Sequence, residues 1–191
     1  MTIKPRLLGL SGSLRKASFN TAILTTLSEA VADRATLEIF PLNPVPLYDG
    51  DEDTATPPDA VAALRAKIAG ADGLVIASPE YNQGISGVLK NALDWASRPY
   101  GKSCLTGKVM LTMTASPAST GGARAQANLN ETLLSVAAQI VLRPQAVIGA
   151  ANQKVKDGRL IEAATLAFLQ AGINDLLRDI ARNASVLTQQ S

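Results

Sequence analysis

The stretch that decides the fold is Leu7 to Asn20, which reads LLGLSGSLRKASFN. It begins as a short apolar run, passes through small hydroxyl and glycine residues, and then opens a segment with helical spacing. A strand that ends this way before a helix is a ready anion site, because the helix N-terminus offers unpaired N–H groups and a partial positive charge. Its serines and Asn20 add donors, Arg15 adds a cation, and the first acidic residue of the chain is Glu29. We therefore predict a phosphate site; the alternative is that a serine only caps the helix and that the cations are solvated.

The spacing of the glycines limits which phosphate this loop can hold. The stretch lacks the G-x-G-x-x-G fingerprint of dinucleotide sites and the G-x-x-x-x-G-K-[ST] loop of nucleoside triphosphate sites. A hydroxyl-rich loop of this kind suits the terminal phosphate of a mononucleotide. In flavodoxin-type proteins FMN takes that position, at the switch point of a doubly wound sheet. The sequence therefore predicts noncovalent FMN rather than FAD.

Two further motifs stand later in the chain. One is Pro79-Glu80-Tyr81-Asn82, followed by Lys90-Asn91-Ala92-Leu93-Asp94-Trp95; the other, weaker one is Ser116-Pro117 with Gly121-Gly122 after it. Together with Gly12-Ser13-Leu14-Arg15-Lys16-x-Ser18-x-Asn20, they resemble the motifs of the NAD(P)H-dependent FMN reductase family. Members of that family include quinone, chromate and azo-dye reductases with a flavodoxin-like fold. The resemblance runs through nearly the whole chain, and the first two motifs together are specific.

The rest of the chain alternates strands and helices. Apolar runs predict strands at 7–10, 37–40, 73–77 and 108–115 and within 139–149, because strands of a parallel sheet are buried on both faces. Helical spacing predicts helices over 19–31, 58–70, 84–97, 122–136 and 161–180. Five alternations predict an α/β fold, a flavodoxin-like doubly wound five-stranded parallel sheet in the order 2-1-3-4-5 with helices on both faces. Because no repeat or linker divides the chain, we expect one domain over residues 1–191.

Composition excludes several classes of function. The chain has no histidine, which removes the commonest general base and metal ligand, so a Ser-His-Asp hydrolase is excluded and a metal site is not expected. A single cysteine excludes an internal disulfide framework. The net charge of +2 and the 4% aromatic content give no support for a nucleic-acid or membrane partner. No leader or membrane-length apolar run is present in the sequence, so we expect a cytoplasmic protein. If it is an enzyme, a cofactor rather than a side chain carries the chemistry.

Loops that follow neighbouring parallel strands meet at one edge of the sheet. The two strongest motifs follow strands one and three and Ser116 follows the next strand, so the three loops should converge on the switch-point crevice. The resemblance implies that the first loop holds the FMN phosphate, that the second lies along the isoalloxazine edge, and that the third touches the other rim. The predicted cofactor-binding residues are Ser11, Ser13, Leu14, Arg15, Ser18, Asn20, Pro79, Glu80, Tyr81, Asn82, Ser116 and Gly121. Tyr81 could instead be an exposed loop aromatic, and Glu80 a simple loop carboxylate.

Two segments outside these loops allow alternative interpretations. Residues 43–58, with four prolines and an acidic cluster, form a loop: the resemblance implies a rim over the flavin, whereas the alternative is a solvated connection.

Trp95 lies to one side of the apolar stripe of its helix, which favours an interface, and the resemblance implies a homodimer or homotetramer; the alternative is a tryptophan buried within one subunit. Arg98 and Tyr100 are candidate substrate-binding residues beside that interface, for an NAD(P)H phosphate or an anionic acceptor.

The resemblance implies an enzyme in which NADPH or NADH reduces FMN by hydride transfer. The reduced flavin then passes two electrons to a small acceptor, such as a quinone, an azo dye, chromate or free flavin. The alternative from another class is a flavodoxin-like electron-transfer or redox-sensing protein without turnover. Electron-transfer flavodoxins are usually strongly acidic, and this chain has a pI of about 8.8. Rapid NAD(P)H oxidation by the purified protein separates the two.

Overall fold

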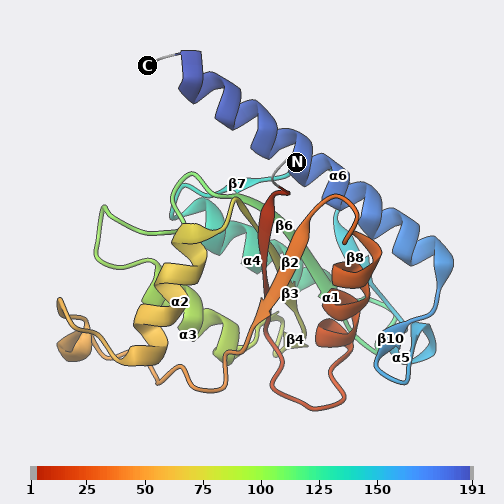
Figure 1. The fold of residues 1–191 in the computed structure, drawn as a ribbon. Coiled ribbons are helices and arrows are strands. Elements are labelled where there is room, and N and C mark those ends of the chain that lie inside the picture. Colours follow the sequence, from red (N-terminus) through yellow and green to blue (C-terminus); the bar gives the residue numbers. More distant parts are fainter. Residues whose placement is uncertain (1–3, 190–191) are drawn as a thin grey trace.

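The computed structural model describes residues 4–189, and its centre is a parallel sheet (Figure 1). The strands are β1 (Arg6–Ser11), β2 (Thr36–Phe40), β3 (Gly73–Ser78), β6 (Val109–Ala115), β7 (Gln139–Ile140) and β8 (Ala146–Ile148). They pair in the order β2-β1-β3-β6-β7, and β8 also pairs with β6, all in parallel. Counted with β7 and β8 as one interrupted strand, this confirms the predicted order 2-1-3-4-5.

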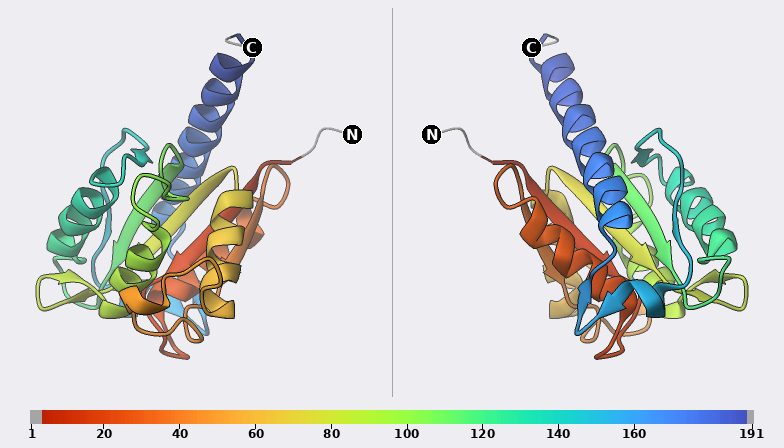
Figure 2. Two further views of the ribbon diagram at one scale, coloured as in Figure 1. Left: turned by 90° about the vertical axis from the view of Figure 1, so that its left-hand side faces the viewer. Right: turned by 90° about the vertical axis from the view of Figure 1, so that its right-hand side faces the viewer.

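Helices cover both faces of the sheet (Figure 2). On one face lie α1 (Phe19–Ala30) and the long α6 (Ala163–Gln189), whose C-terminal end extends beyond the sheet. On the other face lie α2 (Asp59–Gly70), α3 (Gly87–Ala96) and α4 (Ala123–Leu134). Each face has its own apolar cluster because successive side chains of a strand point to opposite faces: Val75 packs toward α1 and α6, whereas Leu74 and Ile76 pack toward α2 and α3.

The fifth strand is split, which the sequence analysis did not predict. Residues 142–145 leave the sheet between β7 and β8, and they include Pro144, which has no N–H to contribute to a ladder. Arg143 turns instead to α6, where its Nη2 donates to the carbonyl oxygen of Phe168 at 2.9 Å and its guanidinium lies 4.4 Å from that ring. The interruption therefore places a cation against α6.

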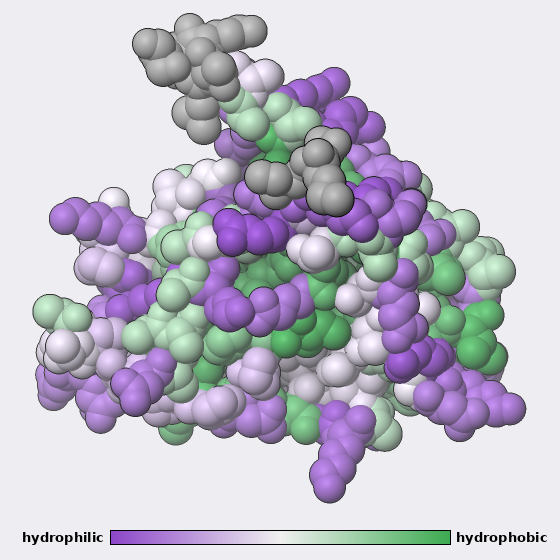
Figure 3. Space-filling view, viewed as in Figure 1, coloured by the Kyte–Doolittle hydropathy of each residue, from purple (hydrophilic) through white to green (hydrophobic). Residues whose placement is uncertain are grey.

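Short elements complete the described chain. They are the 3-10 turn η1 (Gly50–Glu52), the hairpin of β4 (Glu80–Tyr81) and β5 (Gly84–Ile85), the short helix α5 (Ala151–Lys154), and the hairpin of β9 (Val155–Lys156) and β10 (Arg159–Leu160). Both hairpins lie at the carboxyl end of the sheet, the lower edge in Figure 1. The face shown in Figure 3 is largely hydrophilic, with hydrophobic groups in its middle over the edge strand β2. Among the described helices, none combines the length and apolarity needed to span a bilayer.

Candidate functional site

The β1–α1 loop, residues 12–18, leaves a row of backbone donors open. Ser18 is the N-cap of α1, and its Oγ accepts the N–H of Thr21 at 3.1 Å. Within the part of the chain that the structure describes, no group accepts a hydrogen bond from the amide N–H groups of residues 14–17, 19 and 20. Unpaired amides at a helix N-terminus without a nearby carboxylate attract anions. The capping alternative and the phosphate prediction are therefore compatible, since Ser18 caps the helix and the other donors stay free.

Asn20 and Ser11 tie the start of α1 to the strand ends beneath it. The Nδ2 of Asn20 donates to the carbonyl oxygen of Ala115, the last residue of β6, at 3.2 Å. The Oγ of Ser11 lies 2.7 Å from the Thr21 Oγ1. Asn20 is 3% exposed, and its Oδ1 is buried without a partner among residues 4–189. The start of α1 therefore carries one unsatisfied buried acceptor beside its unpaired backbone donors.

The second motif forms a tight hairpin rather than an irregular loop. β4 and β5 pair with each other, and the two residues between them, Asn82 and Gln83, take left-handed φ values of 51° and 68°. Pro79 before the hairpin is buried, whereas Tyr81 is 52% exposed. The hairpin thus presents an aromatic ring and a turn at the carboxyl edge of the sheet.

Glu80 anchors this hairpin to α4. Its Oε2 accepts the backbone N–H groups of Arg124 at 2.9 Å and of Ala125 at 3.0 Å, and the N-cap residue Gly122 offers no side chain for that purpose. On the other strand, the Ile85 N–H donates to the Asn128 Oδ1 at 3.3 Å. The simple loop carboxylate does not describe Glu80, because its carboxylate caps α4 from outside that helix. The cofactor contact of Glu80 stays a prediction.

The third loop, residues 116–122, folds over the end of β8. Its Ser116 donates its N–H to the Ile148 carbonyl oxygen at 3.1 Å, and its Oγ accepts the Ala118 N–H at 3.2 Å. Gly121 has φ 62°, and a Cβ there would lie 2.7 Å from the Val147 Cγ1, so only glycine fits this turn.

Direct contacts join the three loops into one site. The Gly12 N–H donates to the Ala77 carbonyl oxygen at 2.8 Å, and a Cβ on Gly12 would lie 3.2 Å from the Pro79 Cδ and 2.8 Å from the Ser86 Oγ. A Cβ on Gly122 would lie 3.4 Å from the Glu80 Cβ. The structure therefore brings the predicted loops together. Gly12 and Ser86 were not among the predicted site residues; the small residues on either side of Gly12, Ser11 and Ser13, are the signal by which Gly12 could have been found.

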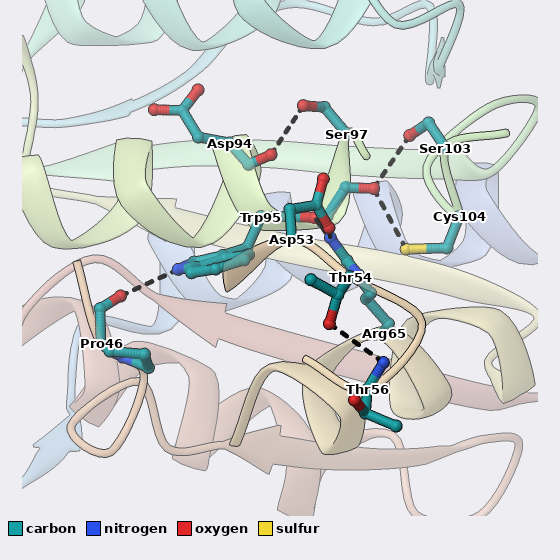
Figure 4. A network of polar contacts seen from close by, with 11 residues as sticks. Pro46, Asp53, Thr54, Thr56, Arg65, Asp94, Trp95, Ser97, Ser103 and Cys104 are labelled. Atoms are coloured by element: carbon teal, nitrogen blue, oxygen red, sulfur yellow. Dashed lines mark hydrogen bonds and ion pairs between the residues drawn. The ribbon is translucent and has the colours of Figure 1, made fainter. Parts of the chain in front are cut away.

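The β2–α2 loop, residues 41–58, is bound to the helices beside it (Figure 4). The Pro46 carbonyl oxygen accepts the Trp95 Nε1–H at 2.9 Å and the Asn91 Nδ2–H at 2.7 Å. Asp53 pairs with the Arg65 Nη2 at 2.7 Å. The loop is therefore anchored to α2 and α3 at these points, while most of its residues are exposed, and residues 41–43 border the β1–α1 loop. Its place as a rim over the flavin stays a prediction.

Trp95 is completely buried within the chain, so the prediction that it lies at an interface is wrong. The physical reason is the β2–α2 loop, which covers the outer side of α3 and supplies the partner of the indole N–H. The Arg98–Tyr100 segment is exposed, with Tyr100 at 92%. It follows the C-terminal end of α3, whereas the site precedes the N-terminal end, and ten helical residues span about 15 Å. Within one chain, Arg98 and Tyr100 are therefore separated from the three loops.

Cys104 lies near the β2–α2 loop but outside the three loops of the site. Its Sγ donates to the Ala96 carbonyl oxygen at 3.4 Å (Figure 4). Burial raises the pKa of the Cys104 thiol above its ordinary value, although the Arg65 charge opposes that shift. The thiol is therefore neutral near pH 7. Among residues 4–189, no three acidic or cysteine side chains gather where they could hold a metal ion.

The chain is similar to known proteins in sequence and in fold. Residues 5–153 match the family described as NADPH-dependent FMN reductase. The chain is 38% identical to a quinone reductase of Escherichia coli over 173 residues, which covers 88% of this chain and 92% of the relative. It is 37% identical to an NAD(P)H-dependent FMN reductase of Pseudomonas aeruginosa over 172 residues, covering 90% and 92%. Its fold is similar to that of FerB, a flavoenzyme NAD(P)H:(acceptor) oxidoreductase from Paracoccus denitrificans, with a TM-score of 0.83, 31% identity, and coverage of 93% of this chain and 98% of that one.

Proposed function

The chain belongs to the NADPH-dependent FMN reductase family, and we propose that its three joined loops hold the FMN with which it reduces quinones at the expense of NAD(P)H. The observation that carries the proposal is the open row of amide N–H groups in the β1–α1 loop, beside a hairpin that presents Tyr81. When bound, FMN supplies the redox chemistry, accepting a hydride from the nicotinamide and giving two electrons to the acceptor.

The donors and acceptors of the site fit this cofactor. A phosphate accepts hydrogen bonds only, and it would meet the free amides of residues 14–17 together with the Arg15 guanidinium. Ser18 uses its oxygen as the cap and keeps its hydroxyl proton for the phosphate. A ribityl chain carries hydroxyl donors, which match the orphaned Asn20 Oδ1. These residues would hold the polar tail of the cofactor.

The remaining loops would orient the ring and keep one face open to substrates. Tyr81 would form an aromatic wall, and the Asn82 turn and the 116–121 loop would offer backbone groups to the polar ring edges. Glu80 acts indirectly, because its carboxylate holds the hairpin against α4. No side chain of the site is needed as an acid or base for hydride transfer, in agreement with a chain that has no histidine.

Three finer points complete the proposal. The acceptors would include azo dyes, chromate and free flavin as well as quinones, because a flavin with one open face does not select strongly among them. The enzyme would work in the cytoplasm, where NAD(P)H is available. It would assemble as a homodimer or homotetramer in which the exposed Arg98–Tyr100 segment reaches the cleft of a second copy. That arrangement would overcome the separation of this segment from the loops of its own chain.

The test is direct. The purified protein should be yellow, should bleach anaerobically with NADH or NADPH, and should regain its colour when a quinone is added. Heat-released cofactor should run as FMN in chromatography. Release of FAD would refute the assignment of the phosphate loop. A yellow protein that NAD(P)H does not bleach would favour the electron-transfer alternative instead.

A further inference from the structure

A cavity of about 470 Å³ lies between the first turns of α1 and the β9–β10 hairpin. Figures 1 and 2 show this hairpin beside the N-terminal end of α1. A second hollow, of about 270 Å³, lies beside residues 41–43 next to the same β1–α1 loop. Lys16 and Thr21 line both. A ligand in the larger cavity would therefore border the phosphate loop, and its volume is within the usual range of about 300–1,000 Å³ for small-molecule sites.

The lining of this cavity combines apolar and cationic groups. Phe19, Ala22 and Val155 supply apolar surface, and Lys16 and Arg159 supply positive charge. Lys16 has no ion-pair or hydrogen-bond partner among the described residues, whereas the Arg159 Nη2 lies 2.8 Å from the Glu29 Oε1. The one carboxylate in the lining is that of Asp157. An aromatic surface next to two cations suits a planar base that carries a phosphate.

We propose that this cavity binds the adenosine end of NADPH and that Arg159, with Lys16, recognises its 2′-phosphate. The proposal rests on the proposed function, because it requires a nicotinamide at the adjoining flavin site. NADPH carries its adenosine at the end opposite the nicotinamide, so that end must leave the flavin cleft and find surface nearby. The adenine would lie on the surface formed by Phe19 and Val155. A guanidinium can bind the 2′-phosphate through two parallel hydrogen bonds, which NADH cannot accept.

Glu29 limits how much of the Arg159 positive charge is available to a bound phosphate. Its carboxylate forms an ion pair with Arg159, and the side chains of Glu29 and Arg159 are 58% and 49% exposed. An incoming 2′-phosphate must therefore compete with the Glu29 carboxylate for the Arg159 guanidinium. Neutralising Glu29 should therefore strengthen binding of the phosphate, whereas removing Arg159 should weaken it. Lys67 provides a matched control, because it makes a similar ion pair. Its Nζ lies 2.7 Å from the Glu38 Oε1, and the side chains of Lys67 and Glu38 are 48% and 57% exposed. Lys67 is on α2 and does not line the cavity.

The experiment is calorimetric titration of the FMN-loaded protein with 2′,5′-ADP, which has the 2′-phosphate, and with 5′-AMP, which lacks it. FMN keeps the phosphate loop filled, so the titration reports another site. Wild type should bind 2′,5′-ADP about tenfold more tightly than 5′-AMP, a difference that corresponds to about 1.4 kcal/mol. Arg159→Ala should abolish this preference, Glu29→Gln should increase it, and Lys67→Ala should leave it unchanged. In steady state, Arg159→Ala should raise the KM for NADPH about tenfold and leave the KM for NADH unaltered.

Three results would overturn the proposal: equal affinity for the two nucleotides, equal effects of Arg159→Ala and Lys67→Ala, or a Glu29→Gln variant that binds 2′,5′-ADP more weakly than wild type. Failure of the proposed function looks different. In that case the protein would not retain FMN or would not oxidise NADH. An FMN-loaded protein that oxidises NADH but ignores the 2′-phosphate contradicts only the assignment of the cavity.

Discussion

Replacing Glu80 tests whether the position of the β4–β5 hairpin depends on α4. In Glu80→Ala, the N–H groups of Arg124 and Ala125 lose their acceptor at the start of a helix whose N-cap is a glycine. Loss of a cap costs about 1 kcal/mol, and loss of a negative charge near the helix N-terminus costs about 0.3–1 kcal/mol more. Because Glu80 is half-buried and water can reach part of the vacated site, we expect a total of about 1–2 kcal/mol.

For a chain of 191 residues, such a loss lowers Tm by roughly 2–4 °C per kcal/mol, or about 2–8 °C in total. The assay is thermal unfolding of the apoprotein, followed by FMN titration at a temperature where both variants are folded. Glu80→Ala should also bind FMN several-fold more weakly, because the freed hairpin must be ordered again on binding. Glu80→Gln keeps an oxygen acceptor and should recover most of both losses.

Glu131→Ala is the matched control, since Glu131 is an exposed carboxylate on the same helix and its side chain has no polar partner among residues 4–189. It should change the unfolding free energy by less than about 0.5 kcal/mol. If Glu80→Ala and Glu131→Ala unfold alike, Glu80 does not cap α4. If Glu80→Ala is less stable but binds FMN like wild type, the cap stabilises the helix without positioning the hairpin.

Three further changes test other parts of the structure. Arg15→Ala should weaken FMN binding about 10- to 100-fold, for a lost charge-assisted contact of about 1.5–3 kcal/mol, and barely affect riboflavin, which has no phosphate; equal weakening of both ligands would mean that the residue is structural. Gly12→Ala places a Cβ 2.8 Å from the Ser86 Oγ and should cost about 1–3 kcal/mol in urea unfolding, whereas Gly87→Ala, with open space around it, should be tolerated. The raised pKa of Cys104 means that the folded state retains the thiol proton above the ordinary cysteine pKa, so stability should fall as the pH rises above that ordinary pKa, and Cys104→Ser should remove this slope; an unchanged slope would assign it to other groups.

Features of the fold that depend on local pattern and chain order could be predicted from the sequence. Continuous apolar runs located β1, β3 and β6 to within about two residues, and the order of the motifs placed three loops at one edge of the sheet. Ser18 as a helix cap also follows from local sequence alone. These predictions succeed because an apolar run, a capping serine and the alternation of strands with helices can each be recognised within a short stretch of the chain.

Two of the failures involve partners that are distant in sequence. Whether Trp95 faces solvent depends on the position of the β2–α2 loop, whose Pro46 lies 49 residues earlier in the chain. Nothing in the sequence of the Trp95 helix indicates where that loop packs. Glu80 likewise takes its hydrogen bonds from residues 44 and 45 positions later. The turn at residues 82 and 83 was missed because Asn-Gln is a weaker hairpin signal than Asn-Gly. Patterns of residue type determine which elements form, and packing between distant segments determines what their side chains contact.

The burial of Trp95 gives the protein an intrinsic optical reporter. It is the only tryptophan of the chain, its indole is fully buried, and the Tyr48 ring lies edge-on at 4.8 Å. Indole emission shifts to longer wavelengths when water reaches the ring, so the emission spectrum reports whether the β2–α2 loop is docked on α3. Flavins absorb light in the range where tryptophan emits, so the emission intensity also falls when the cofactor binds. Loop docking and cofactor loading can therefore be followed separately, by wavelength and by intensity, without any attached label.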